Sequence, residues 1–524
     1  MKLKKEGMMR KQWIALLLIL VMALSVTGCG GGGDQAKERL IIADDEWYGT
    51  DLYQQDTWST VQSLIADALF SIDPETGELL DGICTDLETS EDGLTMTMTV
   101  PEGKYFATGK QVEPEDVVAS IEWGKQVSPY ADGYSNITSM EVDGRKVIFH
   151  LSSFRSDLLY YLGDCFMGVI GKDQLDSMSK DELMWGAVPY GIYYVASYEP
   201  GSSVTLKPNE GYVTDVPLVK NKGVGLIKEI YVKFNTDDFT LIEELKSGAI
   251  DYWSGVTMDA MAQLKGSKNV TLAKKTYPVV DFMEINTDNS IFEDLKLRQA
   301  LSLLINRESL CELTNGAAVP AYSMIYDNMM YFSQMAKDDF MENYANDVER
   351  GKALLTEAGW VDKDNNGYLT KDGKVLEFTM YASTDPTRQI IVQGMQEQLK
   401  QYGFKMSIEA IDWNYVHEFL TANDYDTGIH SLEWAEPILI LNCCFDDPNA
   451  ANNNDAFYAA INDAATTVDD QERSDKLGAI QIELHKEWNM IPIYSDVYYI
   501  AHNAAVKGID ILENGFIYWN DLSL

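Results

Sequence analysis

The pattern of apolar and polar positions predicts strands and helices in mixed order along this chain. Residues 94–100 alternate apolar side chains with threonine, which predicts a strand with one solvent-facing side. Residues 60–70 carry apolar side chains at helical spacing, which predicts a helix. The same criteria predict strands at 40–43, 147–151 and 230–234, and helices that begin at Pro114, end before Gly248, and cover 297–310 and 390–401. The fold class expected from this mixture is α/β (mixed α+β).

Length and composition favour a folded chain with more than one core. The 524 residues are 46% hydrophobic, which excludes a disordered chain, and they are too many for a single core. Acidic residues outnumber basic ones by 82 to 41, for a formal net charge of −41. This charge argues against nucleic acids and anionic lipid surfaces as partners. It favours cationic ligands or serves only to keep the surface soluble.

The first residues are typical of an export signal. Lys2, Lys4 and Lys5 precede an apolar run at 13–26, which is shorter than the roughly 20 residues that a spanning helix needs. A basic start followed by a short apolar run indicates a secretory signal peptide. An uncleaved N-terminal anchor is the alternative.

The apolar run ends in Val26-Thr27-Gly28-Cys29, which resembles the lipobox of bacterial lipoproteins. The resemblance implies that residues 1–28 are removed and that Cys29 is lipidated. Four glycines follow Cys29, so residues 29–39 are expected to form a flexible tether. We therefore expect the folded part to be lipid-anchored at the outer face of the cytoplasmic membrane.

Several stretches, in order, resemble the extracellular solute-binding proteins of family 5, the oligopeptide, dipeptide and nickel importer class. The most recognisable is Pro101-Glu102-Gly103-Lys104-Tyr105-Phe106, followed by Pro114-Glu115-Asp116-Val117. Similar stretches lie at 198–209, 245–251, 285–287, 298–307, 353–360 and 491–494. Because they keep the family's order over most of residues 40–520, chance is a poor explanation.

The resemblance implies a two-lobe, periplasmic-binding-protein-like type II fold with an extra small subdomain. In that fold the two lobes close on a ligand at a hinge. The expected division is lobe I at 40–78, 191–284 and 495–524, the extra subdomain at 79–190, and lobe II at 285–494.

The resemblance also implies ligand-binding residues. In the family, one stretch carries a pocket tyrosine, another a pocket tryptophan, and a Trp-x-x-Asp strand pairs with peptide and binds its α-amine. The matching positions here are Tyr130, Trp413, Leu432, Glu433, Trp434 and Glu436. Trp47 and Tyr48, just after the first predicted strand, are further candidates. Ordinary core packing is the alternative for the aromatic residues.

One stretch departs from the family's pattern. Pro437 stands where the Asp of Trp-x-x-Asp is expected, and Glu433 and Glu436 are the nearby carboxylates. This leaves two ligand classes open, a peptide-like solute and another solute such as a metal chelate, an opine or a glycoside.

The sequence lacks the common catalytic and metal-binding motifs, so no enzyme activity, metal or cofactor is predicted. The sequence holds no His-Glu-x-x-His, Gly-x-Ser-x-Gly, phosphate loop or Cys-x-x-Cys. A secreted lipoprotein hydrolase assembled from distant residues is the remaining alternative. Residues 362–367 begin like a calcium loop, but Gly373 replaces the expected Glu, which favours a solvated turn. Adjacent Cys443 and Cys444 are interpreted as buried thiols.

Together these features predict a monomeric binding protein that captures a peptide or peptide-like solute. It would deliver this solute, by closure of its cleft, to an ABC permease with its ATPase subunits.

Overall fold

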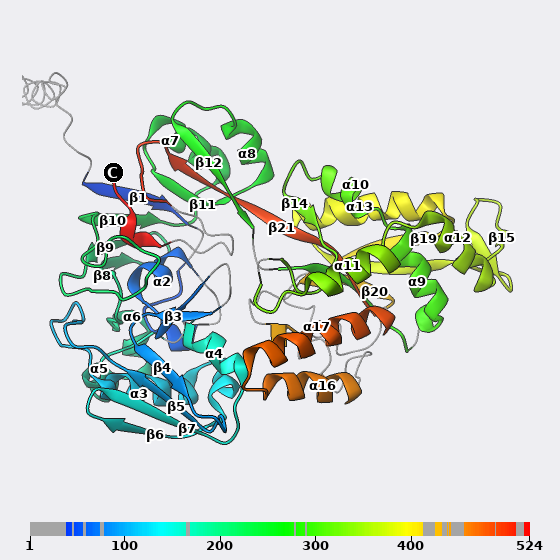
Figure 1. Cartoon of the computed structure of the whole chain (residues 1–524). Coiled ribbons are helices and arrows are strands. Elements are labelled where there is room, and N and C mark those ends of the chain that lie inside the picture. Colours follow the sequence, from blue (N-terminus) through cyan, green and yellow to red (C-terminus); the bar gives the residue numbers. More distant parts are fainter. Residues whose placement is uncertain are drawn as a thin grey trace, which may run out of the picture. The chain divides into compact units, whose positions relative to one another are not determined.

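The computed structural model describes residues 38–524 except 45–46, 56–58, 74–77, 164–167, 277–278, 289–290, 328, 412–424, 432–436, 439, 442–454, 488 and 510–517. Residues from Arg39 to Leu524 form one compact unit, which is described here by itself (Figure 1).

One large sheet organises this unit. In the part of the chain that the structure describes, twelve strands join into it, with ten in the order β19-β18-β20-β13-β21-β11-β1-β10-β9-β8 and with β12 and β14 also paired to β21. Their bounds are β1 (Arg39–Ala43), β8 (Tyr193–Glu199), β9 (Ser203–Pro208), β10 (Glu229–Lys233), β11 (Tyr252–Val256), β12 (Val270–Thr276), β13 (Asp281–Ile285), β14 (Ala318–Pro320), β18 (Glu377–Ser383), β19 (Lys405–Ile411), β20 (Thr427–Ser431) and β21 (Met490–Asn503).

The long strand β21 belongs to both halves of this sheet (Figure 1). Its residues 490–494 pair with β13, and residues 497–503 pair with β12. Between them, residues 494–496 pair with β14. The two halves of the sheet are therefore joined by the backbone of a single strand.

Smaller sheets and helices surround the large sheet. The smaller strands are β2 (Phe70–Ile72), β3 (Leu79–Asp81), β4 (Thr85–Thr89), β5 (Thr95–Thr99), β6 (Ile137–Asp143), β7 (Lys146–Leu151), β15 (Asp362–Lys363), β16 (Leu369–Lys371) and β17 (Lys374–Val375). The helices are η1 (Leu52–Gln54), α2 (Thr60–Ile65), α3 (Pro114–Val127), η2 (Ala131–Tyr134), α4 (Ser156–Gly163), α5 (Lys172–Ser177), α6 (Lys180–Gly186), α7 (Asp238–Ser247), α8 (Met258–Leu264), η4 (Ile291–Glu293), α9 (Leu295–Leu304), α10 (Arg307–Glu312), α11 (Gln334–Asn343), α12 (Val348–Glu357), α13 (Pro386–Gln401), α16 (Asp455–Ala465), α17 (Asp470–Glu487) and η6 (Trp519–Asp521).

Buried side chains form separate cores on either side of the middle of β21. The first group packs around β1, β10 and the four-stranded sheet β4-β5-β7-β6, with a smaller core under α7 and α8. The second group packs on the two faces of β13. We call these two groups, with the elements that build them, the first lobe and the second lobe. The finer division expected at residues 79, 190, 285 and 494 stays a prediction.

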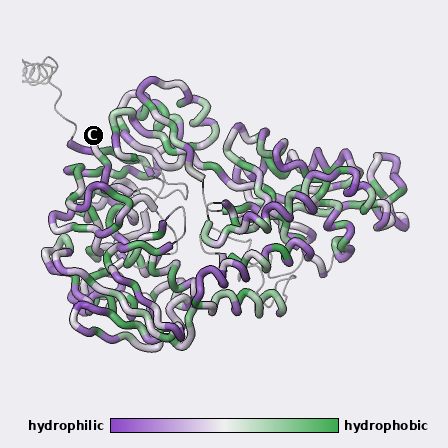
Figure 2. Tube along the Cα trace, in the orientation of Figure 1, coloured by the Kyte–Doolittle hydropathy of each residue, from purple (hydrophilic) through white to green (hydrophobic). Residues whose placement is uncertain are grey.

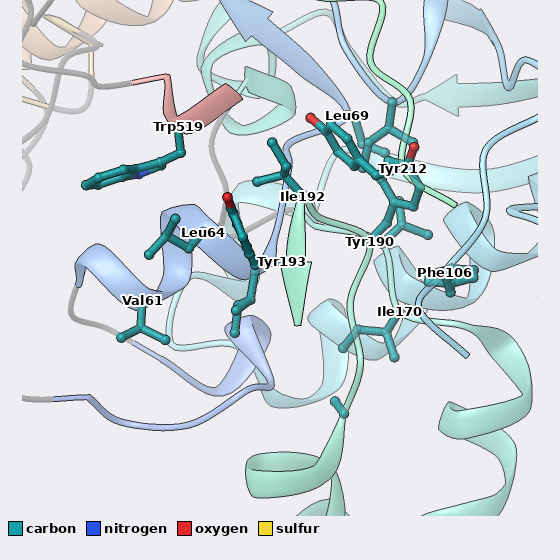
Figure 3. Close-up of a cluster of buried hydrophobic side chains, with 14 of the residues drawn as sticks. Val61, Leu64, Leu69, Phe106, Ile170, Tyr190, Ile192, Tyr193, Tyr212 and Trp519 are labelled. Carbon is teal, nitrogen blue, oxygen red and sulfur yellow. The ribbon is translucent and has the colours of Figure 1, made fainter. Parts of the chain in front are cut away.

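Aromatic side chains fill much of the first lobe's core (Figure 3). The rings of Tyr190 and Tyr212 stack with centroids 5.5 Å apart, and Phe106 meets Tyr190 edge-on at 6.1 Å. Trp519, near the C-terminus, packs edge-on against Tyr252 of β11 at 5.4 Å. The C-terminal residues therefore help to complete the first lobe's core.

Most predicted elements are confirmed, including the strand at 94–100 and the helix that begins at Pro114. Gly248 ends α7 in the left-handed conformation, with φ of 77°, where glycine is favoured. Asp364 shapes the β15–β16 turn, because its carboxylate accepts backbone hydrogen bonds from Asn366 and Tyr368. Residues 364–367 thus form a polar turn, as predicted, whereas residues 362–363 form β15.

Two predicted helices are wrong in extent. The helix expected over 60–70 stops at Ile65, because Ala66 is extended and Asp67 donates its amide to Tyr190 on another segment. Phe70 then begins a strand. The helix expected over 297–310 is two helices, because Ile305 is extended and Asn306 caps α10. The spacing of apolar residues alone did not reveal the extended residues Ala66 and Ile305, at which these helices end.

Two of the cysteines are described. Cys84 and Cys311 are buried free thiols, and burial raises the pKa of each to about 12. Cys443 and Cys444 lie outside the described residues.

Apolar segments alternate with polar ones along most elements (Figure 2). Among the described residues, none of the helices combines the length and apolar character needed to cross a bilayer.

Asp67 is a buried acid of the first lobe with a raised pKa. Its carboxylate accepts a hydrogen bond from the Tyr212 hydroxyl at 2.6 Å, and that hydroxyl accepts one from Asn520 at 3.3 Å. A small hollow of about 120 Å³ adjoins it, lined also by Phe70 and Trp519. Burial raises the pKa of Asp67 to about 6, although Tyr212 and the charge of Lys104 favour the ionised form.

We expect Asp67→Asn to change how stability depends on pH. In the wild type, the stability due to protonated Asp67 is complete below about pH 4 and is lost as pH rises through 6, because the folded state holds its proton more tightly. The amide that replaces this carboxyl in the variant has no such proton, and its oxygen can still accept from Tyr212. Urea unfolding between pH 4 and pH 7 should show the wild type losing up to about 3 kcal/mol relative to the variant. A parallel pH profile for both proteins would contradict this.

The control is Asp92→Asn. Hydrogen bonds from Ser90 and Leu94 lower the pKa of exposed Asp92, so its pH effect has the opposite sign.

Candidate functional site

In each lobe, the carboxyl ends of parallel strands lie at one edge of the sheet. In the first lobe, β1 is parallel to β10 and β11, so these strands end at a common edge. In the second lobe, β18 is parallel to β20. Ligands of open α/β sheets bind at the carboxyl ends of parallel strands. A ligand site is therefore expected at these two edges.

The register of β21 shows that both edges meet at its middle. Val256, at the end of β11, lies opposite Tyr499, and Asp281, at the start of β13, lies opposite Tyr494. Asp281 also lies opposite Ser431, the last residue of β20. The carboxyl ends of both lobes therefore converge on residues 494–499, where the halves of the sheet join. We take this convergence as the candidate ligand site.

A buried ion pair lies at the second lobe's edge. Arg388, in the first turn of α13, donates to the Oδ1 atom of Asp281 from Nε at 3.0 Å and from Nη2 at 2.5 Å. It also donates to the hydroxyls of Ser383 at 2.9 Å and Ser431 at 3.2 Å, which end β18 and β20. Although burial opposes its charge, the neighbouring Asp281 carboxylate raises the pKa of Arg388 above its ordinary value.

The Asp281–Arg388 pair links β13, β18, β20 and α13 at this edge. The Asp281 side chain is fully buried and that of Arg388 is 8% exposed. Asp385 caps α13 by accepting from the Arg388 amide at 2.8 Å, which fixes the position of the Arg388 backbone. Within the described residues, the Oδ2 atom of Asp281 accepts no hydrogen bond. A buried carboxylate oxygen without a donor is unfavourable unless water or a ligand supplies one.

A second polar cluster lies on the other face of β13. Glu284 accepts from the Tyr425 hydroxyl at 2.8 Å, and its other oxygen lies 2.7 Å from Nε2 of His430. Because a carboxylate only accepts, His430 carries its proton on Nε2 in this bond. Burial, followed by the charge of Glu284, raises the pKa of Tyr425 above its ordinary value. The Phe282 ring packs edge-on against His430 at 4.5 Å.

The first lobe's edge has its own carboxylate. Asp44, directly after β1, accepts from the Thr60 amide at 3.1 Å and from the Ser254 hydroxyl at 3.0 Å. Thr60 begins α2, whose N-terminus is closed by a capping box between Ser59 and Gln62. Asp44 thus ties β1, β11 and α2 together at the edge that faces the middle of β21.

The structure describes three of the predicted ligand residues. Trp47 is 4% exposed and packs edge-on against Tyr198 at 4.8 Å and against Trp185 at 5.6 Å. Tyr48 is half-buried, and its carbonyl accepts from Gln55. Tyr130 is half-buried just before η2. The contacts described here for Trp47 and Tyr48 lie within the first lobe.

The remaining predicted residues, Trp413, Leu432, Glu433, Trp434 and Glu436, lie outside the described residues. Leu432–Glu436 directly follow Ser431, at the carboxyl end of β20. All of the predicted ligand contacts stay predictions.

Sequence reasoning did not single out Asp44, Asp281 or Arg388. A signal for Asp281 was available, because it is the one charged residue between Val279-Val280 and Phe282-Met283. A lone acid inside an apolar strand needs a buried partner. Its partner is more than a hundred residues away, and the sequence did not identify it.

The family-like stretch at 101–109 lines a different surface. Tyr105, Phe106 and Gly109 border a surface hollow of about 610 Å³, together with Tyr194 and Lys207 of the β8–β9 pair. This hollow lies where β9 ends and β10 begins, which is the amino end of β10. It is therefore at the opposite end of the strands from the candidate site.

Comparison with known proteins decides the family. The profile described as "Bacterial extracellular solute-binding proteins, family 5 Middle" matches residues 78–436. The chain belongs to this family. The oligopeptide-binding protein AppA of Bacillus subtilis (strain 168) is 23% identical over 465 residues, which cover 83% of this chain and 82% of AppA. The glutathione-binding protein GsiB of Salmonella typhi is 24% identical, over 93% of this chain and 95% of GsiB.

A solved structure of the family supports the fold. NikZ from Campylobacter jejuni, crystallised in complex with Ni(L-His), matches with a TM-score of 0.74 and 22% identity, over 93% of this chain and 100% of NikZ. The predicted family and the predicted mixed α/β, two-lobe binding-protein fold are confirmed. Family 5 proteins capture solutes for ABC importers, so this much of the predicted function is confirmed as well.

The Asp281–Arg388 pair gives a prediction about stability. Asp281→Asn and Arg388→Gln should each lower the free energy of unfolding by about 3–5 kcal/mol, because each leaves a buried charge without its partner. The double variant should lose less than the sum of the two losses, by about 1–3 kcal/mol. Urea unfolding of the four proteins measures this coupling.

The exposed pair Lys405–Glu377 provides the control cycle, since its side chains are 48% and 56% exposed. Lys405→Gln and Glu377→Gln should be coupled much more weakly than the buried pair, because solvent screens their charges. Equal coupling in both cycles would show that burial does not set the strength of the Asp281–Arg388 pair.

Proposed function

We propose that this protein captures a peptide or peptide-like solute outside the cytoplasm and delivers it to an ABC permease with its ATPase subunits. The convergence of both carboxyl edges on the middle of β21 carries the proposal, because a solute there would lie between the two lobes. A bend in β21 near residue 497, where its pairing passes from β14 to β12, would open or close that site and leave most of both halves of the sheet paired.

The peptide part of the proposal is supported by similarity to AppA and GsiB, which are named for oligopeptide and glutathione. Extended peptides bind by pairing with exposed strand backbone, and Ser431 ends a strand at the candidate site. The predicted contacts Tyr130, Trp413 and Trp434 would supply aromatic walls, with Glu433 or Glu436 meeting the amine. The protein would act as a monomer, by binding and without turnover of its solute.

A non-peptide solute is the second candidate. Pro437 replaces the acid that meets the α-amine in the family's peptide-binding pattern. The fold is also similar to that of NikZ, whose ligand is Ni(L-His). A metal chelate, an opine or a glycoside would need no α-amine contact of that kind.

We further propose that the chain is held at the membrane by a lipid on Cys29. The support is the sequence Val26-Thr27-Gly28-Cys29 after a basic and then apolar start, followed by glycines. A tethered binder stays at high effective concentration near its transporter. The anchor would therefore serve delivery.

Removing the lipid-accepting thiol tests the anchor. Cys29→Ala should move the protein from the membrane fraction to the soluble fraction, because no acyl chain is attached. Immunoblots of the separated fractions measure this. Gly31→Ala, which keeps the thiol in the same tether, is the control and should stay with the membrane. Retention of Cys29→Ala in the membrane fraction would exclude the lipid anchor.

Native mass spectrometry of the purified protein tests solute capture. A co-purified peptide should appear as a mass above that of the chain. The same peptide, added at a hundred times its Kd, should stabilise the protein by about 2.7 kcal/mol in a thermal melt. Unrelated solutes of equal charge should not. A co-purified chelate or sugar instead of a peptide would favour the second candidate, and turnover of the bound molecule would favour a hydrolase.

A further inference from the structure

The two lobes also meet at a contact that does not involve β21. Phe154 and Arg155 precede α4 in the first lobe and reach residues of α16 and α17 in the second lobe (Figure 1). The contact has an aromatic, a polar and an aliphatic part. Each part joins side chains that are more than three hundred residues apart in sequence.

The aromatic part is Phe154 against Arg473. Phe154 is only 5% exposed, yet it is not among the side chains of the first lobe's large core as the described residues define it. Its ring lies 5.7 Å from the guanidinium carbon of Arg473. A guanidinium at this distance from an aromatic face is attracted to it. Part of the burial of Phe154 therefore comes from the other lobe.

Arg473 is held in place by its own lobe. Its Nε donates to the Tyr331 hydroxyl at 2.9 Å, its Nη1 donates to the Thr467 carbonyl at 2.6 Å, and its Nη2 pairs with Asp470. These bonds lie at the edge of the planar guanidinium, and the Tyr331 ring of the same lobe also lies 5.1 Å from its carbon. Arg473 is thus oriented by its own lobe where it meets Phe154.

The polar part is Arg155 of the first lobe against Asn462 of the second lobe. Arg155 is held by its own lobe, because Nε and Nη2 donate to Asp157 at 3.1 Å and 2.7 Å. Its Nη1 points away from that carboxylate and donates to Asn462 of α16 at 3.5 Å. An arginine braced on one side loses little freedom when it makes a bond on the other.

The aliphatic part is close-packed. A Cβ atom added to Gly93 would lie 2.8 Å from Cγ2 of Val468 and 2.7 Å from Cβ of Phe154. Gly93 also has φ of 70°, so this turn favours glycine for two reasons. Val468 is 37% exposed and sits in the turn between α16 and α17. Its exposure shows that the contact is at the edge of the lobes and open to solvent.

We propose that these side chains form a clasp that holds the lobes in the closed arrangement without bound solute. The clasp consists of Gly93, Phe154 and Arg155 on the first lobe and Asn462, Val468 and Arg473 on the second. The proposal rests on the proposed function, since a solute-binding cleft must open and close. It adds that the chain itself sets the balance between the two states, through contacts outside the candidate site.

Small-angle X-ray scattering of the solute-free unit from Arg39 onward tests the clasp. Val468→Asp places a charge against Gly93 and Phe154, so the lobes should separate and the radius of gyration should rise above the wild-type value. Val361→Asp is the matched control, because Val361 is a 57% exposed valine of the second lobe outside the clasp. It should scatter like the wild type.

Arg155→Ala should raise the radius of gyration as well, by removing the bond to Asn462. Its control is Arg350→Ala, since Arg350 donates within the second lobe, to the Asn343 carbonyl. Circular dichroism confirms that each variant is folded. Unchanged scattering of Val468→Asp and Arg155→Ala would overturn the clasp, and so would a wild-type protein that is already open.

These outcomes are separate from the test of solute capture. An open Val468→Asp variant of a protein that binds no solute would support the clasp and contradict the proposed function. A co-purified solute together with unchanged scattering of the variants would support the proposed function and contradict the clasp.

Discussion

The backbone hydrogen bonds of β21 are the constraint on which the rest of the structure depends. Residues 490–494 are paired in the second lobe and residues 497–503 in the first, so neither lobe can leave the other without losing ladder bonds. Buried backbone groups without partners are costly, which makes that loss unfavourable. The pairing of β21 passes from β14 to β12 between residues 496 and 497. Both carboxyl edges meet there, so a small bend at this point alters the site most directly.

Buried arginines tie distant segments of the second lobe together. Arg388 is neutralised by Asp281 and links the ends of β18 and β20. Arg307 is fully buried and donates to the Pro492 carbonyl at 2.7 Å and to the Ser302 hydroxyl at 3.2 Å. Burial lowers the pKa of Arg307 to about 10, so it stays charged at neutral pH. Each guanidinium joins segments that are distant in sequence, where an apolar side chain would only fill space.

Local patterns predicted the elements better than they predicted the site. The alternation at 94–100 identified β5 because one face of that strand is buried and the other is not. Residues 60–70 and 297–310 were each predicted as one helix, since the amide of Asp67 and the cap at Asn306 are not visible in apolar spacing. The pair Asp281–Arg388 depends on two segments about a hundred residues apart. Only the fold shows that they meet, whereas the family motifs identified the family because they are contiguous.

A clasp between lobes can regulate binding only if it is weak. A guanidinium over an aromatic ring contributes about 0.5–2 kcal/mol, and a solvent-exposed hydrogen bond contributes about 1 kcal/mol or less. The sum is of the order of the few kcal/mol that separate major and minor states of a hinged protein. A stronger clasp would keep solute out of the cleft, or keep it from the transporter. Arg155 and Val468 are partly exposed, which keeps the energy of the contact within that range. Hydrogen bonds within their own lobes hold Arg155 and Arg473 in the orientation that the contact needs.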